Sequence, residues 1–254
     1  MFGRDKVAAL VAEFFGTGVL ALVVLAVQRS SVGFPLFVAI AAGLVVGALS
    51  YVFAGASGSY FNPAITLGAW SVRKIRSAQA LSYIVVQLLG GWAAYGLYTY
   101  FVNTSLPSIG GHFTLRSMIA EGVGALIFGF VWAAVSAQRL AASVVGVGLA
   151  LGVVVAGVAA YGYVNPAVAL SARAWVVSDF THWTGWLTYG LGPVVGGVVG
   201  FWAYQLVFGE RMWLASATAT ATSRTLPKAA PAARATAARS TRGATKKAPA
   251  RRKK

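Results

Sequence analysis

The sequence contains no cysteine, few acids and few charged residues of any kind. Only 5 of its 254 residues are Asp or Glu, against 21 Lys and Arg, and 10% of the chain is charged. A soluble domain usually carries about a quarter charged residues, so this composition disfavours a soluble protein. The missing cysteine excludes a disulfide framework and thiolate chemistry.

Residues that would carry catalysis or bind a metal are also scarce. The two histidines, His112 and His182, have no acidic or cysteine partner at ligand spacing, so no metal site is expected. No nucleophile, base and orienting group form a recognisable catalytic set. The sequence therefore argues against an enzyme and indicates no bound cofactor.

Long apolar stretches make up most of the sequence, and 58% of the residues are hydrophobic. Six stretches are long enough to cross about 30 Å of hydrocarbon at about 1.5 Å per residue. They cover residues 7–27, 35–54, 78–101, 116–136, 142–160 and 185–208. Two shorter stretches, near 62–72 and 165–176, each begin with Asn-Pro-Ala and cannot cross alone. We predict an all-α membrane protein with six transmembrane helices and two re-entrant half-helices.

Charge is unevenly distributed along the chain. Eleven cations lie in residues 215–254, which contain no acid, so we expect this segment to be a disordered basic tail. Six spans place both termini on one side, and the cations then divide 18 to 3 in favour of that side. The positive-inside rule therefore predicts cytoplasmic termini in a cell membrane. The tail is a candidate to bind anionic lipid or polyanions, or a solvated extension that fixes orientation.

The chain repeats itself at a spacing of about 105 residues. Asn62-Pro63-Ala64 recurs as Asn165-Pro166-Ala167, and Glu13 recurs as Glu121. Two further residues of the third span recur in the sixth at an offset of 106, Tyr83 as Tyr189 and Gly91 as Gly197. We interpret residues 1–108 and 109–214 as two repeats of three spans. Because three is odd, the second repeat enters the membrane from the opposite side and the pair is inverted.

The two Asn-Pro-Ala turns have a chemical interpretation of their own. Asparagine is a favoured N-cap and proline suits the first helical position, so each turn is expected to start a half-helix. In an inverted repeat the two helix N-termini meet near the membrane midplane, where their dipoles repel cations. The amides of Asn62 and Asn165 could then donate hydrogen bonds to a solute in a central pore. One such tripeptide alone would more simply be a helix start in a loop, but two at equivalent points favour the pore.

Taken together, these motifs resemble those of the aquaporin family, the major intrinsic proteins. The resemblance covers about residues 7–208 and is carried by both Asn-Pro-Ala turns and by residues 12–17, 57–68, 87–91 and 192–197. It implies six tilted helices, two half-helices, a pore through each subunit and usually a homotetramer. It also implies a passive channel for water or small uncharged solutes. The matching glutamates, Glu13 and Glu121, would accept hydrogen bonds from the re-entrant loops.

The chain departs from the family at the outer filter, which usually has four positions, one of them an arginine directly after the second Asn-Pro-Ala. The match places these positions at Ala42, Val153, Gly162 and Val168. Small side chains and the missing arginine predict a wider constriction with less charge. Such a pore would admit glycerol, urea, ammonia or dissolved gases as well as water.

Other side chains could fill the space left at the filter. Arg173 is expected to lie too far outward unless it bends back, and four aromatics flank the turns, namely Tyr60, Phe61, Tyr161 and Tyr163. Aromatic groups at such places more often pack between helices, as we also expect for Trp132, but Tyr60 is a candidate for lining the pore on the cytoplasmic side. The altered filter also leaves open a non-conducting structural or adhesion protein on the same fold. Secondary active transport is disfavoured because buried charge pairs are lacking.

Overall fold

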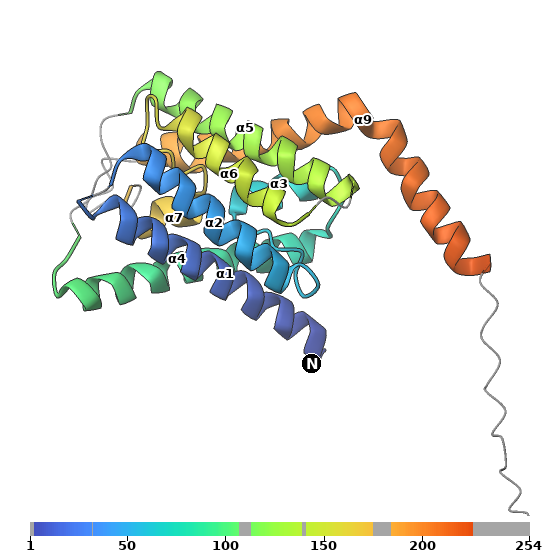
Figure 1. Cartoon of the computed structure of the whole chain (residues 1–254), viewed down its shortest axis with the longest axis horizontal. Helices are drawn as coiled ribbons and strands as arrows, with labels where there is room; N and C mark the ends of the chain where they lie inside the picture. Colours follow the sequence, from blue (N-terminus) through green and yellow to red (C-terminus); the bar gives the residue numbers. More distant parts are fainter. Residues whose placement is uncertain (1–2, 32, 107–112, 139–140, 175–183, 226–254) are drawn as a thin grey trace, which may run out of the picture. The chain divides into compact units, whose positions relative to one another are not determined.

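The structure is a computed structural model that describes residues 3–31, 33–106, 113–138, 141–174 and 184–225. Secondary structure in these ranges is entirely helical (Figure 1). The helices are α1 (Arg4–Gln28), α2 (Pro35–Phe53), α3 (Pro63–Ser71), α4 (Ser77–Val102), α5 (Leu115–Gln138), α6 (Ser143–Ala156), α7 (Pro166–Ser171), α8 (Thr184–Trp186), the π-helical η1 (Leu187–Leu191) and α9 (Gly192–Thr225). The chain divides into two compact units, Met1–Trp213 and Leu214–Lys254. Both histidines, His112 and His182, lie outside the described residues.

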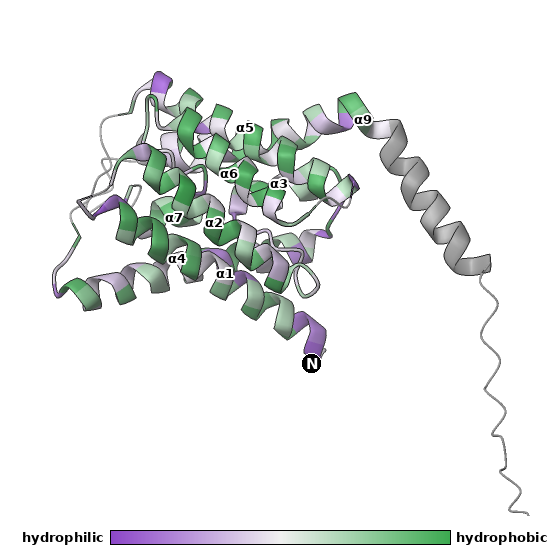
Figure 2. Cartoon of the chain, in the orientation of Figure 1, coloured by the Kyte–Doolittle hydropathy of each residue, from purple (hydrophilic) through white to green (hydrophobic). Residues whose placement is uncertain are grey.

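The predicted all-α membrane fold is confirmed. Within the described ranges, five helical stretches are long and apolar enough to span a bilayer, and α6, at 14 residues, is a shorter apolar helix. Hydrophobic residues cover the middle of the bundle, whereas hydrophilic residues collect at helix ends and loops (Figure 2). Large apolar side chains on the outside, such as Leu44, Trp92 and Leu206, are more than half exposed, as expected for a surface that faces lipid.

Three helix ends differ from the sequence-based boundaries. The helix α6 ends at Ala156 instead of 160, because the chain turns at Gly157 towards the second Asn-Pro-Ala. The helix α7 ends at Ser171 instead of 176, and the residues from 175 to 183 lie outside the described part. The helix α9 continues to Thr225, so the expectation of disorder from residue 215 was wrong for 215–225. These residues are rich in alanine and contain no proline or glycine, so nothing in them stops the helix; residues 226–254 are outside the described ranges.

The two halves of the bundle follow the same order of elements. In each half, two helices precede a half-helix, and one more long helix follows it: α1, α2, α3 and α4, then α5, α6, α7 and α9. The matched glycines pack each third helix against the half-helix of the other half. A Cβ atom added at Gly91 would collide with the carbonyl oxygen of Ala167, and one added at Gly197 would lie 2.8 Å from that of Ala64. These close approaches bring the two half-helices together inside the bundle.

Candidate functional site

The two Asn-Pro-Ala turns start α3 and α7 with the same geometry. Asn62 and Asn165 are extended, with φ of −155° and −147°, and a proline occupies the first helical position after each. The Asn62 Oδ1 atom accepts from the Ala64 N–H at 2.8 Å, and the Asn165 Oδ1 atom accepts from the Ala167 N–H at 2.9 Å. The two side chains therefore cap their helices as the sequence pattern indicates.

The same two asparagines also tie the turns to each other. The Asn62 Nδ2 atom donates to the Val164 carbonyl oxygen at 2.9 Å, and the Asn165 Nδ2 atom donates to the Phe61 carbonyl oxygen at 2.9 Å. Both asparagines are 1% exposed. Reciprocal bonds of this kind hold the two helix N-termini face to face. A primary amide carries two N–H groups, so each asparagine keeps a second hydrogen beyond this cross-link.

The residue before each asparagine is held in a left-handed conformation. Phe61 has φ +49° and Val164 has φ +56°, which is unfavourable for any side chain and most of all for a β-branched one. Such strain costs about 1–3 kcal/mol per residue and persists only where the surroundings fix it. Here it directs each carbonyl oxygen to the opposite asparagine and each N–H to a glutamate. The Phe61 N–H donates to Glu13 at 2.7 Å, and the Val164 N–H donates to Glu121 at 2.6 Å.

Glu13 collects donors from the loop and from a neighbouring helix. Its Oε1 atom accepts from the Ser57 hydroxyl at 2.6 Å and from the Tyr60 N–H at 3.0 Å. Its Oε2 atom accepts from the Gln87 Nε2 atom of α4 at 2.8 Å as well as from Phe61. Glu13 is fully buried, so these donors replace its lost hydration.

Gln87 is a site residue that the sequence analysis did not single out. Its Nε2 atom lies 2.8 Å from Glu13 and 2.9 Å from the Thr66 hydroxyl of α3, so it links α1, α3 and α4. The sequence contained a signal for it, because Gln87 is a polar residue within the third apolar stretch, and such a residue normally has a partner or a function. In the structure Gln87 is fully buried.

Glu121 supports the second turn with fewer partners. It accepts from the Tyr163 N–H at 3.0 Å and from the Val164 N–H, and the Gly162 N–H also interacts with it, so its described donors are backbone groups. At the repeat offset of 106, the position of Gln87 is taken by Pro193, which has no side-chain donor. Pro193 also lacks an N–H, and the preceding turn, Leu187–Leu191, is π-helical.

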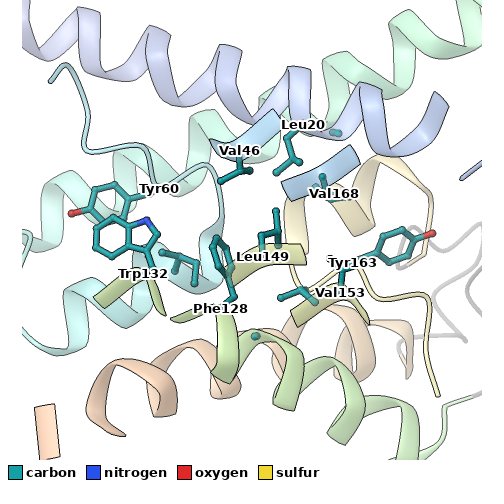
Figure 3. Packing of buried hydrophobic residues seen from close by; sticks show 14 of the residues in the cluster. Leu20, Val46, Tyr60, Phe128, Trp132, Leu149, Val153, Tyr163 and Val168 are labelled. Atoms are coloured by element: carbon teal, nitrogen blue, oxygen red, sulfur yellow. The ribbon is translucent and has the colours of Figure 1, made fainter. Parts of the chain in front are cut away.

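The four filter positions come from α2, α6, α7 and the loop before α7. Ala42, Val153 and Val168 are 2–3% exposed, and Gly162 is buried with φ +71°. Gly162 lies against Val153, because an added Cβ would be 2.7 Å from the Val153 carbonyl oxygen. Figure 3 shows Val153 and Val168 in one row of buried side chains with Leu149. The structure thus brings these apolar residues to the outer half of the bundle, the half that holds residues 157–164.

Arg173 lies at the end of α7 that is remote from Asn165. It follows the C-terminal end of α7, and its Nη1 atom donates to the Leu106 carbonyl oxygen at 2.6 Å. This bond joins the end of the half-helix to the loop after α4. The end of α7 is the end remote from Asn165, as the spacing of eight residues predicts.

The flanking aromatics have different surroundings. The Tyr163 hydroxyl exchanges hydrogen bonds with the Gln28 amide at 3.0–3.1 Å, and its oxygen points away from Val153 in Figure 3. The Phe61 ring fills the space beside Gly16 of α1, where a Cβ would collide with it. Both rings therefore pack between elements. Tyr60, in contrast, stacks on Trp132 of α5 with ring centroids 4.6 Å apart.

The comparison with protein families agrees with this geometry. The sequence model of the family described as Major intrinsic protein matches residues 4–204. The chain belongs to the major intrinsic protein family. It is 31% identical to Aquaporin NIP1-1 of Zea mays over 78% of this chain and 74% of that protein. It is 32% identical to Aquaporin Z of Photorhabdus laumondii over 80% of this chain and 98% of that protein.

A solved structure shares the fold of this major intrinsic protein. The X-ray structure of the aquaglyceroporin from Plasmodium falciparum superposes with a TM-score of 0.63 at 20% identity. The match covers 82% of this chain and 99% of the other. The resemblance drawn from the two Asn-Pro-Ala turns is therefore confirmed at the level of family and fold.

Proposed function

We propose that this chain is a passive membrane channel for water and small uncharged solutes such as glycerol, urea, ammonia or dissolved gases. The observation that carries the proposal is the reciprocal bonding of Asn62 and Asn165, which holds two half-helix N-termini face to face inside the bundle. The aquaporin names of the relatives support the same conclusion. A non-conducting protein on this fold has no comparable support.

The asparagine pair supplies the donors that a solute would meet. The second N–H of each amide donates to the oxygen of a passing water or hydroxyl group. A water that accepts from both asparagines cannot also accept a hydrogen bond from the next water, so a proton wire is interrupted there. The two helix dipoles, each equivalent to about half a positive charge, oppose the entry of cations.

The outer filter favours neutral solutes by a different route. Ala42, Val153, Gly162 and Val168 provide no charge, and their side chains offer no hydrogen-bond donor. An ion gains no compensation there for lost hydration, whereas a neutral molecule loses much less. Cation exclusion therefore depends on the dipoles at Asn62 and Asn165 more than in a channel with a filter arginine.

Flux through proteoliposomes tests this function. Stopped-flow light scattering with the full chain should give water and glycerol permeabilities above those of empty liposomes prepared in parallel. Fast water flux with complete glycerol exclusion would contradict the proposed passage of glycerol. An absence of flux for water, glycerol, urea and ammonia would favour the non-conducting alternative.

We infer in addition that the channel lies in the cell membrane with both termini in the cytoplasm, and that it assembles as a homotetramer with one pore per subunit. The cation distribution supports the orientation, and the family supports the assembly. The eleven cations of residues 215–254 suit anionic lipid of the inner leaflet or another polyanion. Deletion of residues 215–254 should lower affinity for vesicles containing anionic lipid without changing flux per channel. Unchanged affinity would indicate that the tail is only a solvated extension that fixes orientation.

A further inference from the structure

The inner half of the bundle, defined as the half that holds the N-terminus and residues 54–61, contains a stacked aromatic pair. The rings of Tyr60 and Trp132 lie with centroids 4.6 Å apart and planes inclined by 28°. They are 5% and 4% exposed. Figure 3 places them at one end of the row of buried side chains whose other end carries Val153 and Tyr163. The two rings therefore close the end of this buried row that is remote from Val153 and Tyr163.

The position of Tyr60 in the chain leads to the same conclusion. Tyr60 precedes the midplane residue Asn62 by two positions, on the stretch that descends from the inner surface to the start of α3. Its ring reaches across to α5, which belongs to the other half of the chain. The stacked pair thus bridges the two halves of the bundle directly inside the asparagine pair.

Several contacts hold the two rings in place. The Tyr60 N–H is bound by Glu13 at 3.0 Å, and the Trp132 Nε1 atom donates to the Ser59 carbonyl oxygen at 3.4 Å. The Tyr83 ring lies 5.8 Å from Tyr60, and the Phe201 ring of α9 lies 5.4 Å from Trp132. The pair is therefore fixed from α1, α4 and α9 together, and neither ring can turn aside without disturbing a neighbour.

A cation lies beside this pair. The Lys74 Nζ atom, just after α3, is 5.6 Å from the centre of the Trp132 ring, within the range of a cation–π interaction. The inner site thus combines bulky aromatic rings with a positive charge. The four outer positions, Ala42, Val153, Gly162 and Val168, contain neither.

We propose that Tyr60 and Trp132, with Lys74 beside them, form the constriction that selects solutes by size in this channel, in place of the outer filter. The proposal rests on the proposed channel function. Two constrictions in series limit flux mainly at the narrower one, so enlarging the inner site raises permeability, whereas changing the outer site has little effect until the inner one is opened.

The main test replaces Trp132 with leucine in the full chain. In proteoliposomes, Trp132→Leu should raise glycerol permeability about tenfold and water permeability about twofold, because the larger solute is more sensitive to the constriction. Tyr60→Ala is the second variant, and it should act in the same direction if Trp132→Leu folds poorly. Trp92→Leu is the matched control, because Trp92 is 66% exposed on the outer surface of α4 and its loss should leave both permeabilities unchanged.

A second pair of variants locates the limiting step. Val168→Arg introduces a bulky cation at the outer filter and should lower glycerol permeability less in the wild-type background than in the Trp132→Leu background. In the Trp132→Leu background the same substitution should lower it several-fold, because the outer site then limits flux.

The outcomes separate this proposal from the channel function. A conducting wild type whose permeabilities are unchanged by Trp132→Leu and Tyr60→Ala, but lowered by Val168→Arg, would overturn the proposal and leave the channel intact. A silent wild type that conducts after Trp132→Leu would show that the rings close the pore, and would contradict both the channel function and selection by size. If the wild type and the inner variants all fail to conduct, the channel function and the inner constriction both fail.

Discussion

The two Asn-Pro-Ala turns are alike at their asparagines and different in what surrounds them. In both, the asparagine caps its own helix and bonds to the carbonyl oxygen of the other turn. The glutamate of the first turn, Glu13, also binds the side chains of Ser57 and Gln87, whereas Glu121 binds backbone groups. The midplane geometry is therefore shared, while the contacts that hold it are specific to each half.

The two half-helices, α3 and α7, also differ in length and in the contacts that hold them. The first, α3, has nine residues and is linked to α4 through Thr66 and Gln87. The second, α7, has six residues, and Ala169 stands four positions after its asparagine where α3 has Thr66. The first turn is thus fixed by a polar network and the second by its backbone and by apolar packing. Substitutions at the two asparagines should therefore lower the free energy of unfolding equally. Substitutions at matched positions around the asparagines should lower it unequally.

The largest difference is expected for the two glutamates. Glu13→Leu leaves the N–H groups of Tyr60 and Phe61 and the donors of Ser57 and Gln87 without their acceptor. At about 1–3 kcal/mol for each buried unpaired group, the free energy of unfolding should fall by about 4 kcal/mol or more. Glu121→Leu removes the acceptor of the Tyr163 and Val164 N–H groups and should cost about 2–6 kcal/mol at the same rate, less than Glu13→Leu because no side-chain donor is lost. Unfolding in detergent followed by circular dichroism measures both, and equal losses would refute the difference in support.

Alanine substitution at the two matched glycines should lower the free energy of unfolding by a smaller amount, and a third glycine provides a control. Gly91→Ala places a methyl group against the Ala167 carbonyl oxygen, and Gly197→Ala places one against that of Ala64. Because both obstacles are backbone atoms, each variant should lose about 1–3 kcal/mol, with the greater loss at Gly91, where the approach is closer. Gly96→Ala, on the same helix as Gly91 but with open space around it, should be neutral or slightly stabilising. Equal stability of Gly91→Ala and Gly96→Ala in thermal unfolding would contradict the close packing.

The asparagines themselves should behave as a matched pair. Asn62→Ala and Asn165→Ala each remove one helix cap, worth about 1 kcal/mol, and one cross-link of similar size. Both variants should therefore lose about 2 kcal/mol, within a few tenths of each other. Thermal unfolding of the two purified variants measures the difference. A gap larger than about 1 kcal/mol, beyond the usual spread for such bonds, would show that the symmetry at the midplane is incomplete.

Local patterns in the sequence account for much of the fold. The capping tripeptides located both half-helices, and the offset of 106 residues identified Gly91 and Gly197, each packed against the opposite half-helix. Apolar length located the spans. These features are local, or depend on a repeat that is visible in the chain itself.

Some contacts between residues far apart in the sequence could not be predicted from the sequence. The bond between Glu13 and Gln87 joins residues 74 positions apart, and the stack of Tyr60 on Trp132 joins different halves of the chain. Nothing near Trp132 in the sequence distinguishes it from a tryptophan that packs between helices. The left-handed conformation of Val164 also conflicts with its own preference, and only Glu121 and Asn62 together make it tolerable.

Water and proton flux recorded in the same proteoliposomes shows whether the asparagine pair conducts water and blocks protons. If Asn62 and Asn165 face each other across a conducting midplane and block protons without a filter arginine, water flux should be well above that of empty liposomes. Proton flux, read from an enclosed pH-sensitive dye, should stay at the level of empty liposomes. Proton flux that rises in parallel with water flux, or water flux equal to that of empty liposomes, would contradict this role of the asparagine pair.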